Sequence, residues 1–180
     1  MQQDIQILFE KLSEIGIEKP FQSHTHLVLF GDHVNKIYLI KKGGLVLQHV
    51  HPETGKERAI NFFIPEFHPI ATVSQSFVLN EPSKYILKTF TNTTLIEIHR
   101  SELNRFLQES KWAPLFQDVG VKTMVEKNEL RAHLICLSSL EMLKHLHEHF
   151  PQILQNVPSK YIADFLSITP QCLSKLKRDF

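Results

Sequence analysis

The sequence predicts an α+β fold in which an antiparallel β jelly roll or barrel is followed by helices and a terminal helix–turn–helix. Three observations support this prediction. Six short β-rich runs, separated by turn-forming residues, lie between positions 25 and 99. Before and after them, the apolar residues recur with the helical period instead of the period of two. The stretch 158–180 has the pattern of two short helices joined by a three-residue turn.

The composition is that of an ordinary soluble globular protein that is long enough to bury a real core. Of the 180 residues, 42% are hydrophobic and 22% are charged. The net charge of +1 gives no strongly basic field. Residues 158–180 alone carry four basic and two acidic side chains, which is compatible with nucleic-acid binding but does not argue for it. Neither a signal peptide nor a long apolar run is present, so we expect a cytoplasmic protein.

The first segment predicts an amphipathic helix that ends at Gly16 and Pro20. Its apolar residues recur with helical spacing: Ile5, Leu8, Phe9, Leu12 and Ile15. The β-rich runs follow at 25–30, 36–43, 45–51, 56–64, 84–90 and 93–99. Glycine, proline, aspartate and asparagine cluster between them, and many short, evenly spaced strands indicate a jelly roll or barrel.

Helical patterns occupy the region after residue 100. Ser101 caps a helix, and a longer helical region follows over about 112–137, with Pro114 and Gly120 as points of interruption. Its leucines Leu130, Leu134 and Leu137 step by four and three, which predicts a short dimerisation strip that one helix alone would leave in water. One more helix is predicted to start near Ser139 and to end at Pro151.

The last stretch has the features of a helix–turn–helix. Ala163 supplies the small side chain that two steeply crossing helices need where their backbones approach. Ser167 stands in the joint, where such turns often use glycine for a positive φ. Thr169 offers its hydroxyl as an N-cap, and Pro170 follows at the first helical position. Apolar residues at 162, 166, 168, 173 and 176 complete the two packing faces. A packed pair of helices without a DNA role is the alternative.

The second helix of such a motif enters the major groove of DNA. Residues on its outer face, away from Leu173 and Leu176, are the candidate base contacts: Gln171, Ser174, Lys175 and Arg178. Glutamine suits adenine and lysine suits guanine. Lys160, Lys177 and the hydroxyl of Ser159 are the candidate phosphate contacts. Cys136 and Cys172 have no metal or redox spacing, and we expect both to be small buried hydrophobic residues.

Several short motifs follow one another in the order typical of one family of regulators. They are Gly31-Asp32, Gly43, Gly55-Lys56-Glu57, NFFIPEF at 61–67, Glu129-x-Arg131 and IADFLSITPQCLSKLKR at 162–178. On these motifs, nearly the whole chain resembles the Crp/Fnr-type bacterial transcription regulators. The resemblance implies a cyclic-nucleotide-binding-like β-roll over 1–110, a connector helix over 111–137 that joins a homodimer, and a helix–turn–helix DNA-binding domain over 138–180. It further implies a non-enzymatic protein that binds a palindromic operator in double-stranded DNA, with a small-molecule effector and RNA polymerase as further partners.

The effector site is predicted to be degenerate. In family members that bind cyclic nucleotides, an arginine–serine pair holds the phosphate; here Ser83 matches the serine, but Pro82 occupies the arginine position. Lys84 offers a charge, although strand alternation points it away from Ser83. We therefore expect no binding of cAMP, and an apolar ligand near Phe63 and Phe77 stays open. No cofactor is expected, because a cysteine cluster for iron and sulfur is missing from the sequence.

Two other classes of function compete with DNA binding. The pairs His24-x-His26 and His49-x-His51 lie on predicted strands, where alternation puts both histidines of a pair on one face. A cupin-like metalloenzyme with a helical appendage is therefore one alternative. Because the basic surplus is weak, a second alternative stays open, a sensor or scaffold module whose terminal helices bind protein instead of DNA. The resemblance places both behind a DNA-binding regulator without a metal site.

Overall fold

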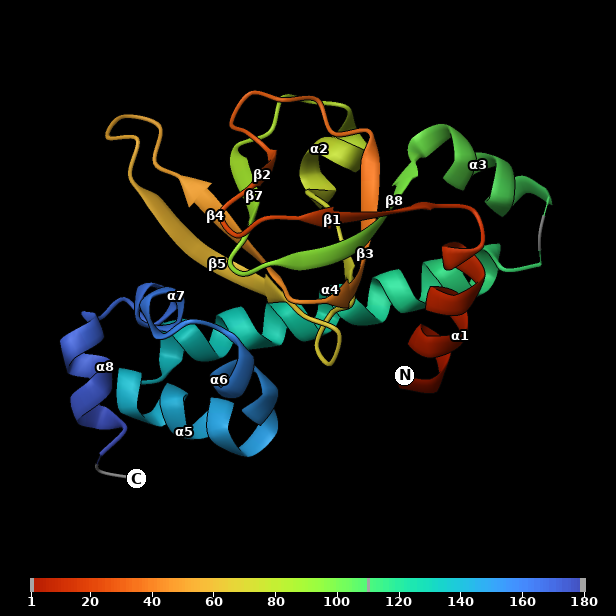
Figure 1. Cartoon of the computed structure of the whole chain (residues 1–180). Coiled ribbons are helices and arrows are strands. Elements are labelled where there is room, and N and C mark those ends of the chain that lie inside the picture. Colours follow the sequence, from red (N-terminus) through yellow and green to blue (C-terminus); the bar gives the residue numbers. More distant parts are fainter. Residues whose placement is uncertain (1, 110, 179–180) are drawn as a thin grey trace.

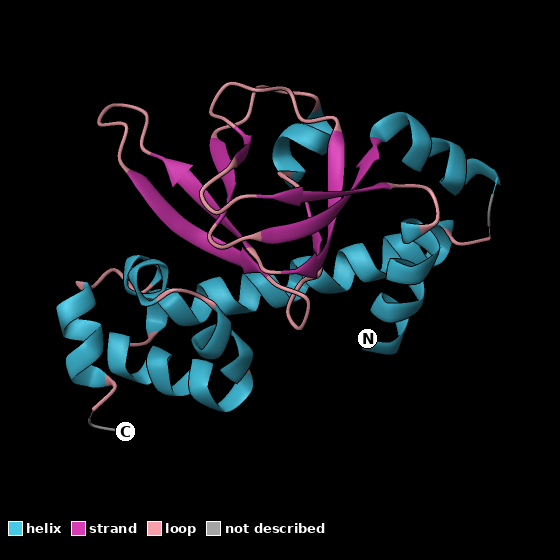
Figure 2. Cartoon of the chain, in the orientation of Figure 1, coloured by secondary structure: helices cyan, strands magenta, loops and turns pink. Residues whose placement is uncertain are grey.

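A computed structural model describes residues 2–109 and 111–178. It shows a β-roll that lies along one side of a long helix, with helices gathered at both ends of that helix (Figure 1; Figure 2). The helices are α1 (Gln2–Ser13), α2 (Ser74–Leu79), α3 (Arg100–Glu109), α4 (Ala113–Cys136), α5 (Ser139–His149), α6 (Pro151–Asn156), α7 (Ser159–Phe165) and α8 (Pro170–Leu176). The strands are β1 (Ile17–Phe21), β2 (His26–Val28), β3 (Lys36–Lys42), β4 (Leu45–Val50), β5 (Glu57–Phe63), β6 (Ile70–Ala71), β7 (Tyr85–Thr89) and β8 (Thr93–His99).

The β-roll consists of two antiparallel four-stranded sheets, which confirms the predicted α+β jelly-roll class. Their strand orders are β1-β8-β3-β6 and β2-β7-β4-β5. All six predicted runs contain a strand, whereas β1 and β6 were not predicted. Both lie at the edges of the first sheet. β1 is largely exposed and contains Pro20, so it lacks an alternating pattern, and β6 is only two residues long.

β3 is buried on both of its faces, which explains its unbroken apolar run. Tyr38 and Ile40 belong to the core inside the roll, together with side chains such as Leu45, Phe63 and Leu95. Ile37 and Leu39 belong instead to a second core that includes residues of α1, α3 and α4. The β-roll is therefore covered on one side by a helix that precedes it in the sequence and by two helices that follow it.

α4 is one continuous helix, so neither Pro114 nor Gly120 interrupts it. Pro114 lies in the first turn, where its missing N–H breaks no helical hydrogen bond. Gly120 is exposed, and a side chain added there would meet nothing within 4 Å. No helix in the described part of the chain has both the length and the apolarity that a bilayer crossing requires.

The leucine strip of α4, whose residues Leu130, Leu134 and Leu137 were predicted as the dimer contact, makes contacts within its own chain. Leu130 is buried, and Leu134 and Leu137 pack against the same core as Leu146 and Phe67. The opposite side of α4 is the exposed one. We call it the outer face of α4, and it consists of Val121, Val125, Asn128, Ala132 and Ile135.

The helices after α4 begin with a capping box. The Ser138 N–H donates to the Glu141 carboxylate at 2.8 Å, and the Glu141 N–H donates back to the Ser138 hydroxyl at 3.4 Å. Pro151 ends α5 as predicted, but it also starts α6, because proline fits the first turn of a helix. The helix α2, which ends four residues before Ser83, was likewise not predicted.

One apolar core joins the second sheet of the roll to the C-terminal helices. Phe62 of β5 packs against Phe165 of α7 with ring centroids 5.2 Å apart, and Phe67 packs against Phe150 at 5.3 Å. β5 is an edge strand, and the N–H of Ala59 donates to Asp164 Oδ2 at 2.6 Å. α7 is therefore held on the edge of the roll by both apolar and polar contacts.

Candidate DNA-contacting surface

α7 ends in a Schellman motif that sets the angle to α8. The Ser167 N–H donates to the Asp164 carbonyl at 3.1 Å, and the Ile168 N–H donates to the Ala163 carbonyl at 3.0 Å. Ser167 has φ +61, so it adopts the left-handed conformation that the sequence pattern assigned to this position. A non-glycine residue pays about 1–2 kcal/mol for that conformation. The closed turn and the buried neighbours hold it there.

α8 begins as the sequence predicted. The Thr169 hydroxyl accepts the Cys172 N–H at 3.1 Å, and Pro170 occupies the first turn. Leu173 is fully buried, and Ala163 is fully buried on α7. A side chain larger than alanine at 163 would push the two helices apart. The predicted helix–turn–helix is thus present with its cap, its turn and its packing residues.

The predicted base contacts lie together on the exposed side of α8. Gln171, Ser174 and Lys175 are exposed, and their helical spacing puts them on one side of α8, away from Leu173 and Leu176. Arg178 is also exposed and lies in the turn that follows α8. The Ser174 hydroxyl donates to the Pro170 carbonyl at 2.9 Å, which leaves its lone pairs for a ligand. The surface formed by Gln171, Ser174, Lys175 and Arg178 is the candidate base-contacting surface.

Both cysteines are exposed, so the prediction that they are buried was wrong. Helical spacing puts Cys172 at the flank of the base-contacting surface, one position before the buried Leu173. A sequence pattern cannot separate such a flank from the buried stripe when the helix is only seven residues long.

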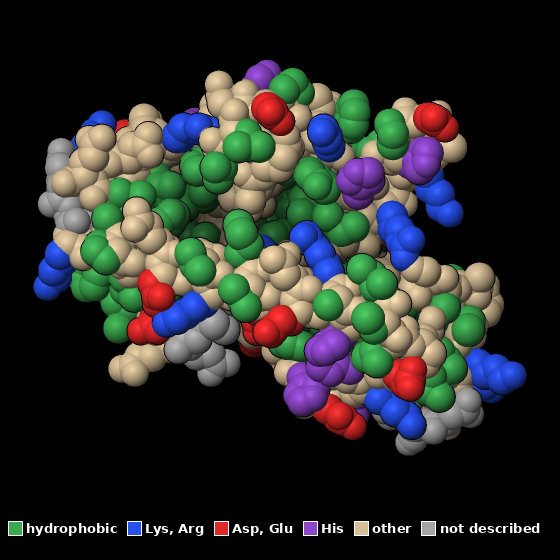
Figure 3. Space-filling model, turned by 180° about the vertical axis from the view of Figure 1, so that it is seen from behind, with side chains coloured by type: hydrophobic (Ala, Val, Ile, Leu, Met, Phe, Trp, Pro, Cys, Tyr) green, Lys and Arg blue, Asp and Glu red, His purple; other side chains and the backbone are tan. Residues whose placement is uncertain are grey.

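The predicted phosphate contacts lie at the start of α7 and at the end of α8. Ser159, Lys160 and Lys177 are exposed. The Lys160 Nζ lies 4.9 Å from the ring centre of Tyr161, and Lys177 borders an apolar groove of about 240 Å³. In Figure 3, the Lys and Arg side chains on the C-terminal helices are separated from one another by side chains of other types.

The predicted effector residues occupy separate environments. The Ser83 hydroxyl donates to the Tyr85 carbonyl at 2.8 Å and accepts the Tyr85 N–H at 3.1 Å, so its hydrogen bonds are made within its own turn. Lys84 is exposed, and Phe63 is buried in the apolar core of the roll. Phe77 stacks under the Arg100 guanidinium, whose carbon lies 4.4 Å from the ring centre.

Polar residues of α4 close the junction with the roll. His68 has a nearly buried side chain, and its Nε2 lies 2.9 Å from Glu126 Oε2. Burial lowers the pKa of His68, although the hydrogen bond to Glu126 acts in the opposite direction. The Lys127 Nζ lies 4.8 Å from the ring centre of Phe63, and burial lowers the pKa of Lys127 to about 8. These contacts fix α4 against the roll.

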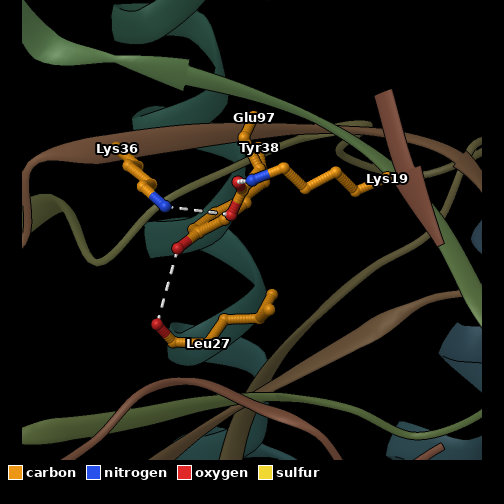
Figure 4. Close-up of polar contacts among 5 residues, drawn as sticks. All are labelled: Lys19, Leu27, Lys36, Tyr38 and Glu97. Carbon is orange, nitrogen blue, oxygen red and sulfur yellow. Dashed lines mark hydrogen bonds and ion pairs between the residues drawn. The ribbon is translucent and has the colours of Figure 1, made fainter. Parts of the chain in front are cut away.

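A charged cluster in the roll was not predicted from the sequence (Figure 4). Glu97 is 7% exposed, and it accepts hydrogen bonds from Lys19 Nζ at 2.6 Å and Lys36 Nζ at 3.1 Å. Burial raises the pKa of Glu97, but the two lysine hydrogen bonds outweigh it and hold the pKa below its usual value. Tyr38, opposite Glu97 in the sheet register, donates to the Leu27 carbonyl at 3.4 Å. All the charged groups of this cluster are paired with each other.

The histidine pairs of the β-rich region do not converge. His24 and His26 are exposed, His49 packs edge-on against Tyr85 with centroids 5.4 Å apart, and His51 Nδ1 accepts N–H groups in the β4–β5 hairpin. Within 2–109 and 111–178, no three His, Cys, Asp or Glu side chains form a set that could hold a metal ion.

No protein-family model and no curated protein matches the sequence. Solved structures do match it. CLP of Xanthomonas campestris, described as a c-di-GMP responsive global regulator, is 17% identical over 94% of this chain and 88% of its own, with a TM-score of 0.70. FixK2 of Bradyrhizobium japonicum is 11% identical over 92% and 84%, with a TM-score of 0.75. The catabolite activator protein of Thermus thermophilus is 13% identical over 99% and 83%, with a TM-score of 0.55. The chain therefore has the fold of the Crp/Fnr-type regulators, as its motifs implied.

Proposed function

We propose that this chain is a cytoplasmic, homodimeric transcription regulator that binds a specific palindromic DNA site and is not an enzyme. The observation that carries the proposal is the capped helix α8, which has Gln171, Ser174 and Lys175 exposed on its outer side and is followed by the exposed Arg178. The fold shared with known regulators supports it. Residues 1–110, 111–137 and 138–180 then act as the sensor-like roll, the connector and the DNA-binding domain.

In this proposal, residues of α8 recognise the bases, and other exposed residues of the C-terminal helices contact the phosphates. Gln171 binds adenine through its amide, and Lys175 binds guanine O6 and N7 in the major groove. Lys160, Lys177 and the Ser159 hydroxyl contact phosphates, which orient the protein without selecting a sequence. Two such helices about 34–36 Å apart require a palindromic site.

The dimer contact of the proposed regulator is the outer face of α4. Val121, Val125 and Ile135 are 63%, 51% and 85% exposed, which is unusual for aliphatic residues on a helix whose other side is already buried. Figure 3 shows hydrophobic side chains along the middle of the molecule, where α4 crosses its back. A second copy that covers this face removes them from water.

The β-roll of the proposed regulator does not take a cyclic nucleotide. A bound phosphate needs a charged fork such as arginine, and Pro82 occupies that position on the surface. The Ser83 hydroxyl is already bonded within its own turn. The roll interior is filled by an apolar core that includes Leu45, Phe63 and Leu87. The effector, if the regulator has one, is of another chemical class.

Selection from random DNA duplexes tests the proposed function. We expect a palindrome to be enriched, and we expect Lys175→Ala or Gln171→Ala to cost about 1–3 kcal/mol of binding free energy and to relax one base position in each half-site. Lys56→Ala removes a charge from the exposed β4–β5 hairpin and should leave the affinity unchanged. If no palindrome is enriched, or if Lys175→Ala binds like the wild type, a protein-binding role replaces this proposal.

Calorimetry with cAMP tests the state of the roll. Because Pro82 occupies the position of the arginine that would hold the phosphate, we expect no heat of binding at about 100 μM nucleotide, which corresponds to a binding free energy weaker than about −5.5 kcal/mol. An affinity in the micromolar range would show that the roll opens and holds the phosphate by other groups.

A further inference from the structure

A single polar residue lies in the middle of the apolar outer face of α4. Val121, Asn128 and Ile135 are spaced by seven residues, and Val125 and Ala132 lie between them. All five side chains are exposed, and none of the five is charged. A seven-residue apolar repeat is the spacing by which two helices pack along a continuous contact.

Among the described residues, the amide of Asn128 has no hydrogen-bond partner. A contact that covers the neighbouring Val125 and Ala132 would cover this amide as well. A buried amide without a partner costs free energy, so an occupant of this face must offer Asn128 a hydrogen bond. A second copy of the same chain offers an identical amide at the same height, and an amide is both donor and acceptor.

We propose that Asn128 pairs with the same asparagine of a second copy across the dimer axis, and that this pair selects a parallel, in-register dimer. The inference rests on the proposed dimeric function. One asparagine in an otherwise apolar helix contact weakens the contact but specifies its register and its number of strands, since a pair that slips out of register buries the amide against an aliphatic side chain.

The parallel orientation follows from the position of the DNA-contacting helices. α7 and α8 lie near the C-terminal end of α4 (Figure 1). α4 has 24 residues and is therefore about 36 Å long. An antiparallel pair centred on Asn128 would also join the two amides, but it would put the two α8 helices at opposite ends of the dimer. Only the parallel pair presents both to one DNA duplex.

Disulfide trapping in the full chain measures orientation and register. The background is Cys136→Ser and Cys172→Ser, which removes both exposed thiols. Ile135→Cys should then crosslink to itself, because equal positions meet in a parallel, in-register dimer. In a mixture of Val121→Cys and Ile135→Cys chains, a disulfide between the two variants would indicate an antiparallel pair. In a mixture of Val125→Cys and Ala132→Cys chains, a disulfide between the two variants would indicate a parallel pair shifted by one heptad.

Asn128→Val tests the role of the amide. We expect it to tighten dimerisation about tenfold or more, while it allows the slipped Val125–Ala132 crosslink or species larger than a dimer in sedimentation. The side chain is exposed, so the fold of the single chain is retained. Asn104→Val on the exposed side of α3 is the matched control and should change neither property.

The outcomes separate this inference from the function on which it rests. A wild-type protein that is a monomer at tens of micromolar overturns both. An antiparallel crosslink overturns the parallel register. A parallel wild-type dimer whose Asn128→Val variant keeps one register and one mass overturns the role of Asn128, and it leaves the dimeric regulator intact.

Discussion

Replacing Val125 with glutamate is expected to turn the dimer into a monomer and to weaken binding to the palindromic site by about 100-fold or more. Val125 lies in the outer face of α4 and belongs to none of the apolar cores of the chain. In a dimer, the substitution puts two carboxylates close to the axis, and like charges at an interface cost several kcal/mol. A loss of about 2.7 kcal/mol of binding free energy already weakens the affinity by a factor of about 100.

Light scattering and fluorescence anisotropy measure this outcome. The Val125→Glu variant should have the mass of one chain, and it should bind an isolated half-site as weakly as a palindrome. Val78→Glu is the matched control, because Val78 is 72% exposed on α2 and lies outside α4. The control should stay dimeric with unchanged affinity. A dimeric Val125→Glu variant would mean that the outer face of α4 is not the contact.

A glutamate at Leu134 would instead disturb packing within the single chain, because Leu134 contacts its own apolar core. The spacing of Leu130, Leu134 and Leu137 indicated an apolar side of the helix, which is correct. The spacing does not state whether that side meets its own chain or another one. α4 has two apolar sides, and only the structure shows that α5 and the roll cover the leucine side.

The strands and the helix–turn–helix were predictable because local chemistry determines them. The runs at 36–43 and 93–99 match β3 and β8 closely, since β-branched residues between turn formers leave few alternatives. Thr169 and Pro170 act at the start of α8, and Ser167 adopts the expected positive φ. Four elements were not predicted from the sequence: β1, β6, α2 and α6. Each is short or lies at an exposed edge, where tertiary pairing and not sequence periodicity defines the element.

The candidate site was predictable only in part for a related reason. Residues on the outer side of α8 follow from helical spacing once its buried leucines are known. Cys172 was assigned to the wrong side, because its chemistry is equally suited to a core and to a surface. The cluster of Glu97 with Lys19 and Lys36 joins residues from three strands, and such a contact depends on the strand order.

Phe165→Ala is expected to destabilise the chain by about 3–5 kcal/mol, because the removed ring leaves a cavity in a core that cannot collapse freely. Phe165 is 2% exposed, and its ring packs on Phe62 of the roll. The substitution therefore weakens the joint between the β-roll and α7. Since α7 carries the turn that orients α8, DNA affinity should fall as well.

Chemical denaturation followed by circular dichroism gives the change in the free energy of unfolding. Phe30→Ala is the matched control, because Phe30 is 54% exposed in the β2–β3 loop and should change stability by no more than about 0.5 kcal/mol. If the roll and the C-terminal helices share one core, the wild type unfolds in a single transition, whereas Phe165→Ala separates it into two. A loss below about 1 kcal/mol with one unchanged transition would mean that the Phe165 ring contributes little to the shared core. In that case, the contact between Phe62 and Phe165 would not hold the DNA-contacting helices on the roll.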